Sequence, residues 1–336
     1  MTVPAAAPAL GTHPGVAMAR HLTTPALVAA IDRLGGRLTE VCGYQLGIRD
    51  EHGRHTATVG GKLLRPAFTL LSAVAAGGAP RAAVPAAVAI ELLHNASLVH
   101  DDIMDGDRTR RGRPTVWAHY GVPLAILAGD ALIALGFEVL AETGSSVTPL
   151  ARTLRLLALG QDSDLDFETR RSVSPSECLA MLTGKTGVLL GCACALGAAS
   201  AGAPAEWVER FDRWGTHLGV AFQLVDDLLG IWGDPAVTGK PVGADLLSRK
   251  KSAPVVAALA ADMGLAQLYA RPGDWDAREV ARVTGLIERT GAREWVRAEI
   301  DRRTELAWAE LAGLDLDPSA RRDLRTLTTA LAIRDH

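Results

Sequence analysis

Long apolar segments without strand alternation most constrain how this chain can fold. Apolar and small residues recur at helical spacing over residues 84–98 and 123–141, and neither segment alternates as a half-buried strand would. Gly-Gly pairs and prolines separate such segments along the chain, and the sequence has neither a βαβ rhythm nor a short repeat. We therefore predict an all-α bundle of roughly ten or more helices, with central helices that are apolar on all sides.

The chain has 336 residues and no convincing internal linker, so we expect one domain over residues 21–336. Residues 1–20 are rich in Pro and Ala and lack the charged start and apolar centre of a signal peptide. We expect them to form a flexible tail. From about residue 274 the chain becomes richer in Arg, Glu and Asp, which predicts amphipathic helices at the periphery.

One uncharged segment is long enough to cross a bilayer. Residues 186–205 carry no charge, and about 20 residues suffice for a span. However, they are mostly Ala, Gly, Ser and Cys, with few large apolar groups. We interpret the segment as a buried core helix whose small residues allow close packing, and we predict no transmembrane segment.

The composition excludes some classes of partner. Lys and Arg number 35 against 38 Asp and Glu, and aromatic residues make up 4% of the chain. Nucleic-acid binders usually show a basic excess and aromatic stacking platforms, so we expect no nucleic-acid partner. The four cysteines, Cys42, Cys178, Cys192 and Cys194, fit neither a disulfide scaffold nor a zinc site. We therefore expect a reduced, cytoplasmic protein.

Three acidic residues follow the first of these apolar segments. Asp101 and Asp105 are one helical turn apart and share a face, whereas Asp102 points about 100° away. Carboxylates this close repel one another unless cations bridge them, and hard oxygen ligands suit Mg²⁺ shared with phosphate oxygens. Taken alone, the motif fits a solvated acidic helix end even better.

A second acidic pair, Asp226 and Asp227, ends another apolar helical run. Two such pairs on separate helices can face one another across the cavity of a bundle. The plain alternative is an acidic pair before a turn that ends at Gly230. That alternative explains one motif more easily than it explains both.

Cations follow the acidic motifs in chain order. The basic candidates are Lys62, Arg65, the arginines of residues 108–113, Lys185, Lys240 and Lys250. Lys62 and Arg65 are expected one helical turn apart, and Lys185 is expected beside a helix N-terminus, which suits an anion. Most surface cations are merely solvated. Cations interleaved with such carboxylates nevertheless indicate a polyanion that is held partly by metal and partly by Lys and Arg.

In combination, these motifs resemble those of the all-trans polyprenyl (isoprenyl) diphosphate synthases, and of geranylgeranyl diphosphate synthases among them. The resemblance covers about residues 60–259 and rests on eight motifs in a fixed order: GGKLLRP, ELLHNASLVHDDIMD, RRGRPT, GDAL, GQDSDLDFE, GKTG, FQLVDDLLG and GKPVGADLLSRKKSAP. It implies an all-α isoprenoid synthase-type helical bundle around a deep central cavity, usually as a homodimer.

The resemblance further implies head-to-tail 1′–4 condensation of isopentenyl diphosphate with an allylic diphosphate, namely dimethylallyl, geranyl or farnesyl diphosphate. The allylic substrate loses pyrophosphate, the double bond of isopentenyl diphosphate attacks the resulting carbocation, and a proton leaves to the released pyrophosphate. Two to three Mg²⁺ ions per active site, together with Lys and Arg, stabilise the leaving charge. Apolar walls exclude the water that would quench the cation.

Roles for individual residues follow from the same resemblance. Asp101 and Asp105 match carboxylates that bridge two Mg²⁺ ions, and Asp226 matches a ligand of a third. The residues that support these ligands or hold metal-bound water are Asp102, Asp227 and Asp245. The residues that match the isopentenyl diphosphate site are Lys62, Arg65, His94 and Arg111. The residues that match the allylic diphosphate site are Arg110, Lys185, Thr186, Gln223, Lys240 and Lys250. The residues expected to be catalytic are Asp101, Asp105, Lys185 and Asp226.

Two positions depart from the pattern of the family. Gly230 stands where many members have a third Asp, so the second motif lacks one outer acid. Ala96, followed by Ser97, stands where farnesyl-forming members and some geranylgeranyl-forming members carry an aromatic floor of the cavity. Each added isoprene unit buries about five carbons, worth roughly 4 kcal/mol, so growth continues until the cavity stops it. A small floor leaves room for at least C20, and we predict geranylgeranyl diphosphate as the product.

Three alternatives stay open. The product can be longer, C25 or more, with growth stopped deeper, near Leu127, Ile133 or Phe137. A terpene cyclase on the same fold would ionise one diphosphate and would need no isopentenyl diphosphate site, so the intact basic residues of that site favour elongation. A non-catalytic subunit of a heteromeric synthase commonly loses the Asp-rich motifs, and this chain keeps the first one whole.

Overall fold

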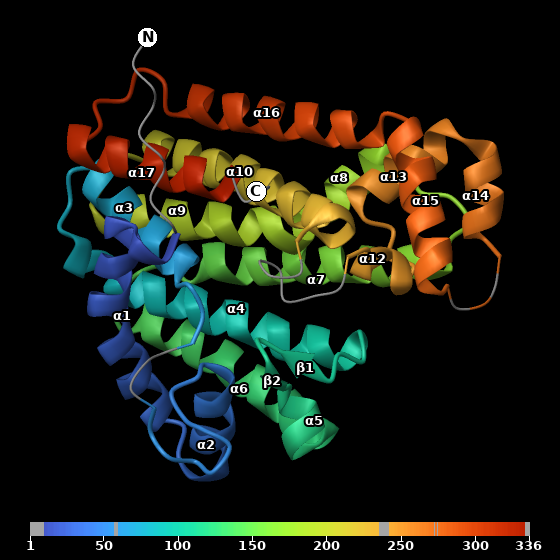
Figure 1. Ribbon diagram of the computed structural model, residues 1–336. Helices are drawn as coiled ribbons and strands as arrows, with labels where there is room; N and C mark the ends of the chain where they lie inside the picture. The colour runs from blue at the N-terminus through green and yellow to red at the C-terminus, as the bar shows by residue number, and fades with distance from the viewer. Residues whose placement is uncertain (1–9, 57–59, 235–241, 272, 274, 333–336) are drawn as a thin grey trace. The chain divides into compact units, whose positions relative to one another are not determined.

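The computed structural model describes residues 10–56, 60–234, 242–271, 273 and 275–332. Lys240 lies outside the described residues. Within them, the named strands form one two-residue antiparallel hairpin, in which Thr109 pairs with Pro114 and Arg110 pairs with Arg113. The remaining regular structure is helical, which confirms the predicted all-α class (Figure 1).

The elements up to residue 141 are η1 (Leu10–Thr12), α1 (Pro14–Asp32), α2 (Gly36–Gln45), α3 (Leu64–Ala75), η2 (Pro80–Ala83), α4 (Val84–Met104), β1 (Thr109–Arg110), β2 (Arg113–Pro114), α5 (Val116–Tyr120) and α6 (Val122–Ala141). The following elements are α7 (Thr148–Thr169), α8 (Pro175–Leu182), the π-helical turn η3 (Thr183–Gly187), α9 (Val188–Ser200), α10 (Ala205–Trp232), α12 (Ala244–Leu247), α13 (Ala253–Ala261), α14 (Met263–Tyr269), α15 (Ala277–Arg289), α16 (Ala292–Glu310) and α17 (Pro318–Ala332). The segments predicted to be helical over residues 84–98 and 123–141 are thus confirmed as parts of α4 and α6.

The flexible tail expected over residues 1–20 is wrong for its second half. Helix α1 begins at Pro14, a first helical position at which proline costs no hydrogen bond. His13 caps this helix, because its Nδ1 accepts a hydrogen bond of 3.1 Å from the amide of Gly15. Val16 and Ala19 are buried. The small and apolar residues of this segment therefore belong to the core, while residues 1–9 lie outside the description.

The chain divides into two compact units. Unit 1 comprises the residues up to Leu154 together with Cys192–Asp212 and Gly313–Leu327, and unit 2 comprises Arg155–Gly191, Arg213–Ala312 and the residues from Thr328. Both units are assembled from discontinuous segments, so no single cut of the chain separates them. The single domain expected over residues 21–336 stays a prediction.

In unit 1, α4 and α6 lie side by side and run antiparallel (Figure 1). A Cβ on Gly129 of α6 would come within 2.0 Å of His100 Nε2, and one on Gly136 would come within 3.2 Å of the carbonyl oxygen of Ala89. The two glycines therefore allow the helices their close approach. Helical spacing places the buried Ala96, between Ala89 and His100, on the same α6-facing stripe of α4.

The uncharged segment over residues 186–205 contains a core helix, as predicted. Residues 189–198 of α9 are buried. Gly197 has no room for a side chain, because a Cβ there would lie 2.1 Å from the carbonyl oxygen of Thr69 in α3. Small residues thus let α9 and α3 pack closely within unit 1.

By length and composition alone, three helical stretches could cross a membrane. They are Pro80–Met104, Val122–Ala141 and Pro175–Ser200. In the first and third stretches, two thirds (67%) of the most apolar window is buried inside the protein, so a place in the core accounts for much of its hydropathy. The absence of a transmembrane segment stays a prediction.

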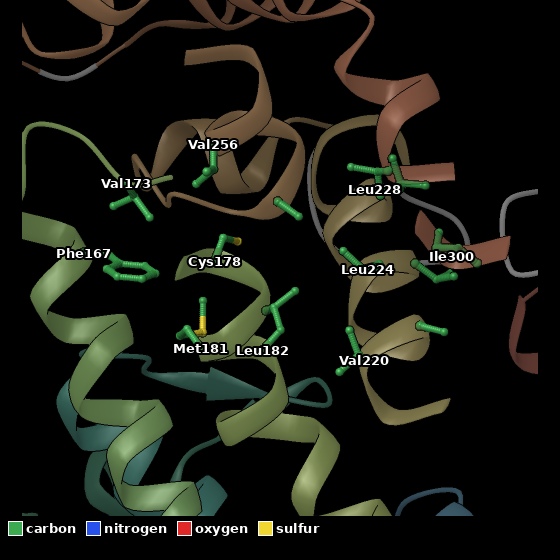
Figure 2. Close-up of a cluster of buried hydrophobic side chains, with 14 residues drawn as sticks. Phe167, Val173, Cys178, Met181, Leu182, Val220, Leu224, Leu228, Val256 and Ile300 are labelled. Atoms are coloured by element: carbon green, nitrogen blue, oxygen red, sulfur yellow. The ribbon is translucent and has the colours of Figure 1, made fainter. Parts of the chain in front are cut away.

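In unit 2, buried apolar side chains from α7, α8, α10, α13 and α16 form one cluster (Figure 2). Helix α10 contributes Val220, Leu224 and Leu228, which recur every four residues along one stripe. Asp227 is three residues after Leu224 and falls on this stripe, whereas Asp226 falls on the other side of the helix. The packing of α10 therefore directs the two carboxylates of the second acidic motif apart.

Candidate active site

The first acidic motif forms the C-terminal end of α4 in unit 1. Asp101 is half-buried in the last turn, and Asp105 is an exposed helix C-cap that keeps helical dihedral angles. Asp102 is buried (1% of its side chain exposed), and its Oδ1 accepts from Nε and Nη2 of Arg110 at 2.7 and 2.6 Å. Asp101 and Asp105 thus lie toward the surface, while Asp102 anchors the motif to the protein.

The burial of Asp102 affects both its pKa and the hydrogen bonding of its carboxylate. Burial raises its pKa, and the ion pair with Arg110 opposes that rise. Its second oxygen, Oδ2, is buried and accepts no hydrogen bond within the described part of the chain. The role of Asp102 in supporting the neighbouring carboxylates stays a prediction.

The hairpin β1–β2 carries two of the predicted arginines, Arg110 at the end of β1 and Arg111 in the turn. Arg111 and Gly112 form the turn with φ of 54° and 75°, the paired positive values of a tight type I′ hairpin. Gly61, which also has a positive φ, lies beside Arg111, because a Cβ on it would be 3.1 Å from the Arg111 Nη1. The turn thus places Arg111 against the GGKLLRP segment, while Arg110 reaches Asp102.

The sequence predicts that Lys62 and Arg65 lie one helical turn apart, and the structure shows that this prediction is wrong. Leu63 adopts a left-handed conformation (φ 50°) and α3 begins only at Leu64, so Lys62 precedes the helix. Arg65 is in the first turn of α3, where its Nη1 lies 3.2 Å from Nε2 of His94 on α4. The structure therefore brings Arg65 and His94 together within unit 1.

The contact with Arg65 determines the protonation state of His94. An arginine can only donate, so Nε2 of His94 accepts and the ring proton resides on Nδ1. Burial lowers the pKa of His94 well below its usual value, and the charges of Arg65, Arg111 and Arg110 lower it further. The Nδ1 atom is buried and has no hydrogen-bond partner among the described residues. His94 is thus a neutral donor.

In unit 2, the second acidic motif belongs to a chain of hydrogen bonds. Thr186 Oγ1 donates to Oε1 of Gln223 (3.0 Å), and Gln223 Nε2 donates to Oδ1 of Asp227 (3.1 Å). The other oxygen of Asp227 accepts from the amide of Ala253, at the start of α13 (2.9 Å). Burial raises the pKa of Asp227 to about 6, although nearby Lys250 opposes the rise. Asp227 therefore orients Gln223 and Thr186, while Asp226 is half-buried on the other side of α10.

Lys185 does not stand at a helix N-terminus, which corrects the sequence-based expectation. It lies in the π-helical turn Thr183–Gly187, inside the continuous helical stretch Pro175–Ser200. Such turns inside helices occur frequently at functional sites. Gly160 of α7 packs against this turn, since a Cβ on it would lie 2.2 Å from the Lys185 amide nitrogen.

The ion pair between Asp164 and Lys185 was not predicted from the sequence. Oδ2 of Asp164 lies 2.6 Å from Nζ of Lys185, and both side chains are mostly buried. The sequence did carry a signal, because Asp164 is part of the GQDSDLDFE motif. The pairing could not be read from that motif, since the two residues are far apart in the chain and meet only when α7 packs against the π-turn.

The remaining predicted residues of unit 2 lie around α12. Asp245 is the second residue of α12, and Lys250 follows this helix, with its amide donating to the Asp245 carbonyl oxygen (2.9 Å). The carbonyl oxygen of Lys250 accepts from the hydroxyl of Tyr269 (2.9 Å). Both residues are therefore anchored by the fold of unit 2.

The proposed chain-length residues are both on α4. Ala96 is completely buried, and the hydroxyl of Ser97 is half-buried and donates to the His94 carbonyl oxygen at 2.8 Å. Among the deeper candidates on α6, Leu127 is 53% exposed, so it does not line a buried cavity within this chain. Ile133 and Phe137 are half-buried.

Among the described residues, no group of three or more His, Cys, Asp or Glu side chains is arranged to hold a metal ion by itself. Mg²⁺ is usually bound through one or two carboxylates, with water and substrate phosphate as the other ligands. The oxygen donors of Asp101 and Asp105, on one face at a helix end, fit that mode of binding.

Comparison with known proteins places these residues in a family. The sequence profile described as polyprenyl synthetase matches residues 48–286, more than half of the chain. The chain belongs to the polyprenyl synthetase family. Membership makes it a prenyltransferase of the type that extends prenyl chains head to tail, and isopentenyl and allylic diphosphates are the substrates of this family.

Relatives from Mycobacterium tuberculosis carry two different product names. The chain is 46% identical over 303 residues to a (2E,6E)-farnesyl diphosphate synthase, covering 87% of this chain and 84% of that protein. It is 43% identical over 297 residues to a geranylgeranyl diphosphate synthase, covering 85% of each. Among solved structures, a polyprenyl synthetase from Streptomyces coelicolor A3(2) matches with a TM-score of 0.90 and 43% identity, over 95% of this chain and 99% of that one. This match agrees with the isoprenoid synthase-type fold that the sequence motifs imply.

Proposed function

We propose that this chain is a Mg²⁺-dependent geranylgeranyl diphosphate synthase. It would condense isopentenyl diphosphate with dimethylallyl, geranyl or farnesyl diphosphate and release an all-trans C20 product. The observation that carries the proposal is the combination at the end of α4 of a carboxylate pair, the half-buried Asp101 and the exposed Asp105, with a small buried residue, Ala96, five positions before Asp101.

In unit 1 we assign the residues to two diphosphates. Asp101 and Asp105 bind the allylic diphosphate through metal, and Asp102 holds Arg110 for the same substrate. The residues assigned to isopentenyl diphosphate are Lys62, Arg65, His94 and Arg111. The neutral His94 supports this assignment, because its buried Nδ1–H can donate to a phosphate oxygen without adding a further charge beside Arg65.

In unit 2 we assign the polar residues to the allylic diphosphate and its metal. Asp226 would provide a ligand for the metal, and Asp227 and Asp245 would act as outer acids that support the metal site. The residues assigned to the diphosphate oxygens are Lys185, Thr186, Gln223, Lys240 and Lys250. The hydrogen-bond chain from Thr186 to Asp227 supports the assignment, because it fixes these side chains before substrate arrives.

Two to three Mg²⁺ ions, when bound, would neutralise the charge that develops on pyrophosphate as the allylic C–O bond breaks. The cationic side chains of the protein stabilise the same charge directly, and this stabilisation is stronger in the transition state than in the bound substrate. Buried apolar residues keep water from the carbocation. Released pyrophosphate takes the proton, so no protein general base is assigned.

A farnesyl diphosphate synthase is the second candidate, favoured by the 46% identity to a relative of that name. The difference from the 43% identity to a geranylgeranyl diphosphate synthase is too small to decide between the products. The deciding experiment incubates the purified protein with Mg²⁺, labelled isopentenyl diphosphate and each allylic primer in turn, and separates the dephosphorylated products. We expect C20; C15 would establish the second candidate. A hydrocarbon released from geranylgeranyl diphosphate alone would instead indicate a cyclase.

We further propose that the protein is a cytoplasmic homodimer. Val122, Ile126 and Leu127, at the start of α6, are 40%, 45% and 53% exposed and lie on one side of the helix, as an interface with a second copy would require. All four cysteines are free and buried, which fits a reducing compartment. Light scattering coupled to size-exclusion chromatography tests the oligomeric state, and Ile126→Glu should shift the protein to a monomer.

A further inference from the structure

We propose that Tyr44 and Arg113 are positioning residues for the isopentenyl diphosphate site, because they clasp the hairpin that carries Arg111 to the last turn of α2. The inference rests on the proposed function, in which Arg111 binds isopentenyl diphosphate. Tyr44 lies outside every motif named above, and Arg113 belongs to RRGRPT and to the basic candidates but is assigned to neither diphosphate. Both residues belong to unit 1.

The clasp consists of reciprocal contacts. Nη2 of Arg113 donates to the carbonyl oxygens of Tyr44 (2.6 Å) and Gln45 (3.3 Å), and its guanidinium lies 4.6 Å from the centre of the Tyr44 ring. In return, the hydroxyl of Tyr44 donates to the carbonyl oxygen of Pro114 (2.8 Å). The last carbonyls of a helix lack partners within it and carry partial negative charge, so a cation is well placed there.

The same turn of α2 also contacts the other segments that carry the proposed ligands. The carbonyl oxygen of Leu46 accepts from the amide of Gly60 (2.7 Å), two residues before Lys62. Nε2 of Gln45 lies 3.4 Å from Oδ1 of Asn95, the neighbour of His94 on α4. The end of α2 therefore holds the GGKLLRP segment, α4 and the hairpin in one arrangement.

Arg111 depends on this clasp more than Arg110 does. Arg110 is tied to α4 by its own ion pair with Asp102. Arg111 makes no hydrogen bond or ion pair in the portion of the chain that the structure describes, and its backbone is in the left-handed region, which a non-glycine residue adopts only when its surroundings impose it. A loosened hairpin should therefore displace Arg111 while Asp102 retains Arg110.

The test compares steady-state kinetics of Arg113→Met, Arg113→Lys and Tyr44→Phe. Arg37→Met is the matched control, because Arg37 is an exposed arginine at the other end of α2 and has no assigned role in binding. In R113M we expect the KM for isopentenyl diphosphate to rise about tenfold, while the KM for the allylic substrate and kcat change by less than about threefold. We expect a smaller rise in Y44F, a partial recovery in R113K relative to R113M, and wild-type values in R37M.

The outcomes separate this inference from the proposed function. Wild-type KM values for isopentenyl diphosphate in both R113M and Y44F would overturn the clasp, and so would an equal rise for both substrates, which a merely structural role would produce. If R113M fails to fold, Y44F decides, because it removes a single hydroxyl and keeps the ring. If the wild-type protein does not elongate prenyl diphosphates, the proposed function fails and the inference falls with it.

Discussion

The carboxylate of Asp245 occupies the space that a side chain at Gly230 would need. A Cβ on Gly230 would lie 2.3 Å from Oδ2 and 2.4 Å from Cγ of Asp245. Gly230 is one helical turn after Asp226 on α10, so the two positions share a face. The acid that the second motif lacks at position 230 is thus replaced in space by one from α12.

We predict that Gly230→Ala raises the Mg²⁺ concentration needed for half-maximal activity severalfold. The added methyl group must displace Asp245, because backbone and carboxylate leave no room for both. Gly285→Ala on α15 is the control: Gly285 is also helical, its Cβ would have only ordinary contacts, and the change should stabilise the protein by about 0.5–1 kcal/mol. A Mg²⁺ titration of the initial rate, unchanged in G230A, would contradict the prediction.

We predict that Asp102→Asn lowers the free energy of unfolding by about 2 kcal/mol, because it weakens a buried charge-assisted contact and removes the carboxylate that is hydrogen-bonded to Arg110. Urea denaturation at fixed protein concentration measures the change. Asp107→Asn is the matched control, since Asp107 is exposed near the same helix end. Equal stability of D102N and D107N would show that the ion pair with Arg110 contributes nothing.

We predict that His94 causes a loss of stability as the pH falls. Burial, Arg65 and Arg111 hold its pKa well below the usual value in the folded protein, whereas the unfolded chain protonates near pH 6.5. The unfolded state therefore binds more protons as the pH falls, so stability declines below about pH 6.5, by about 1.4 kcal/mol at pH 5.5.

His94→Gln should remove that contribution. We expect the loss of stability between about pH 7.5 and about pH 5.5 to be smaller in H94Q than in wild type by about 1.4 kcal/mol, measured by urea denaturation. His52→Gln alters an exposed histidine and should leave the loss as in wild type. Equal losses in wild type and H94Q would mean that His94 does not stay neutral in the fold.

We predict that Ala96→Phe shortens the product. The ring would project from the α6-facing stripe of α4, where the wild-type side chain is completely buried, and the overpacking should cost about 1–3 kcal/mol of stability. Chromatography of the dephosphorylated products gives the chain length, and Ala96→Val should have a weaker effect in the same direction. A C20 product from a folded A96F variant would refute the assignment of Ala96 as the cavity floor.

Local sequence predicted the elements that rely on period and composition. The helical spacing over residues 84–98 and 123–141 corresponds to α4 and α6, because a buried helix of small and apolar residues has no competing strand pattern. The glycines of the GDAL and GKTG motifs, Gly129 and Gly184, are explained only by packing, against His100 and Gly160 respectively.

Three local predictions were wrong because tertiary contacts override local patterns. Proline and alanine near the N-terminus indicated a flexible tail, yet α1 begins at Pro14 and buries Val16 in the core. The glycines around Lys185 indicated a helix start, yet they form a π-turn where α7 approaches closely. Lys62 and Arg65 were expected one helical turn apart, yet Leu63 is left-handed and α3 begins only after it. No pattern in the sequence indicates that conformation.

The sequence by itself determined the class of fold and the chemical character of the site, because helical period, paired carboxylates and the order of the motifs are properties of neighbouring residues. Only the tertiary structure decided which partners those residues meet. Asp102 with Arg110, Lys185 with Asp164, and Arg113 with the end of α2 are pairs from separate segments. Such pairs form when helices pack, and the packing depends on shape and burial along the whole chain, which no local pattern encodes.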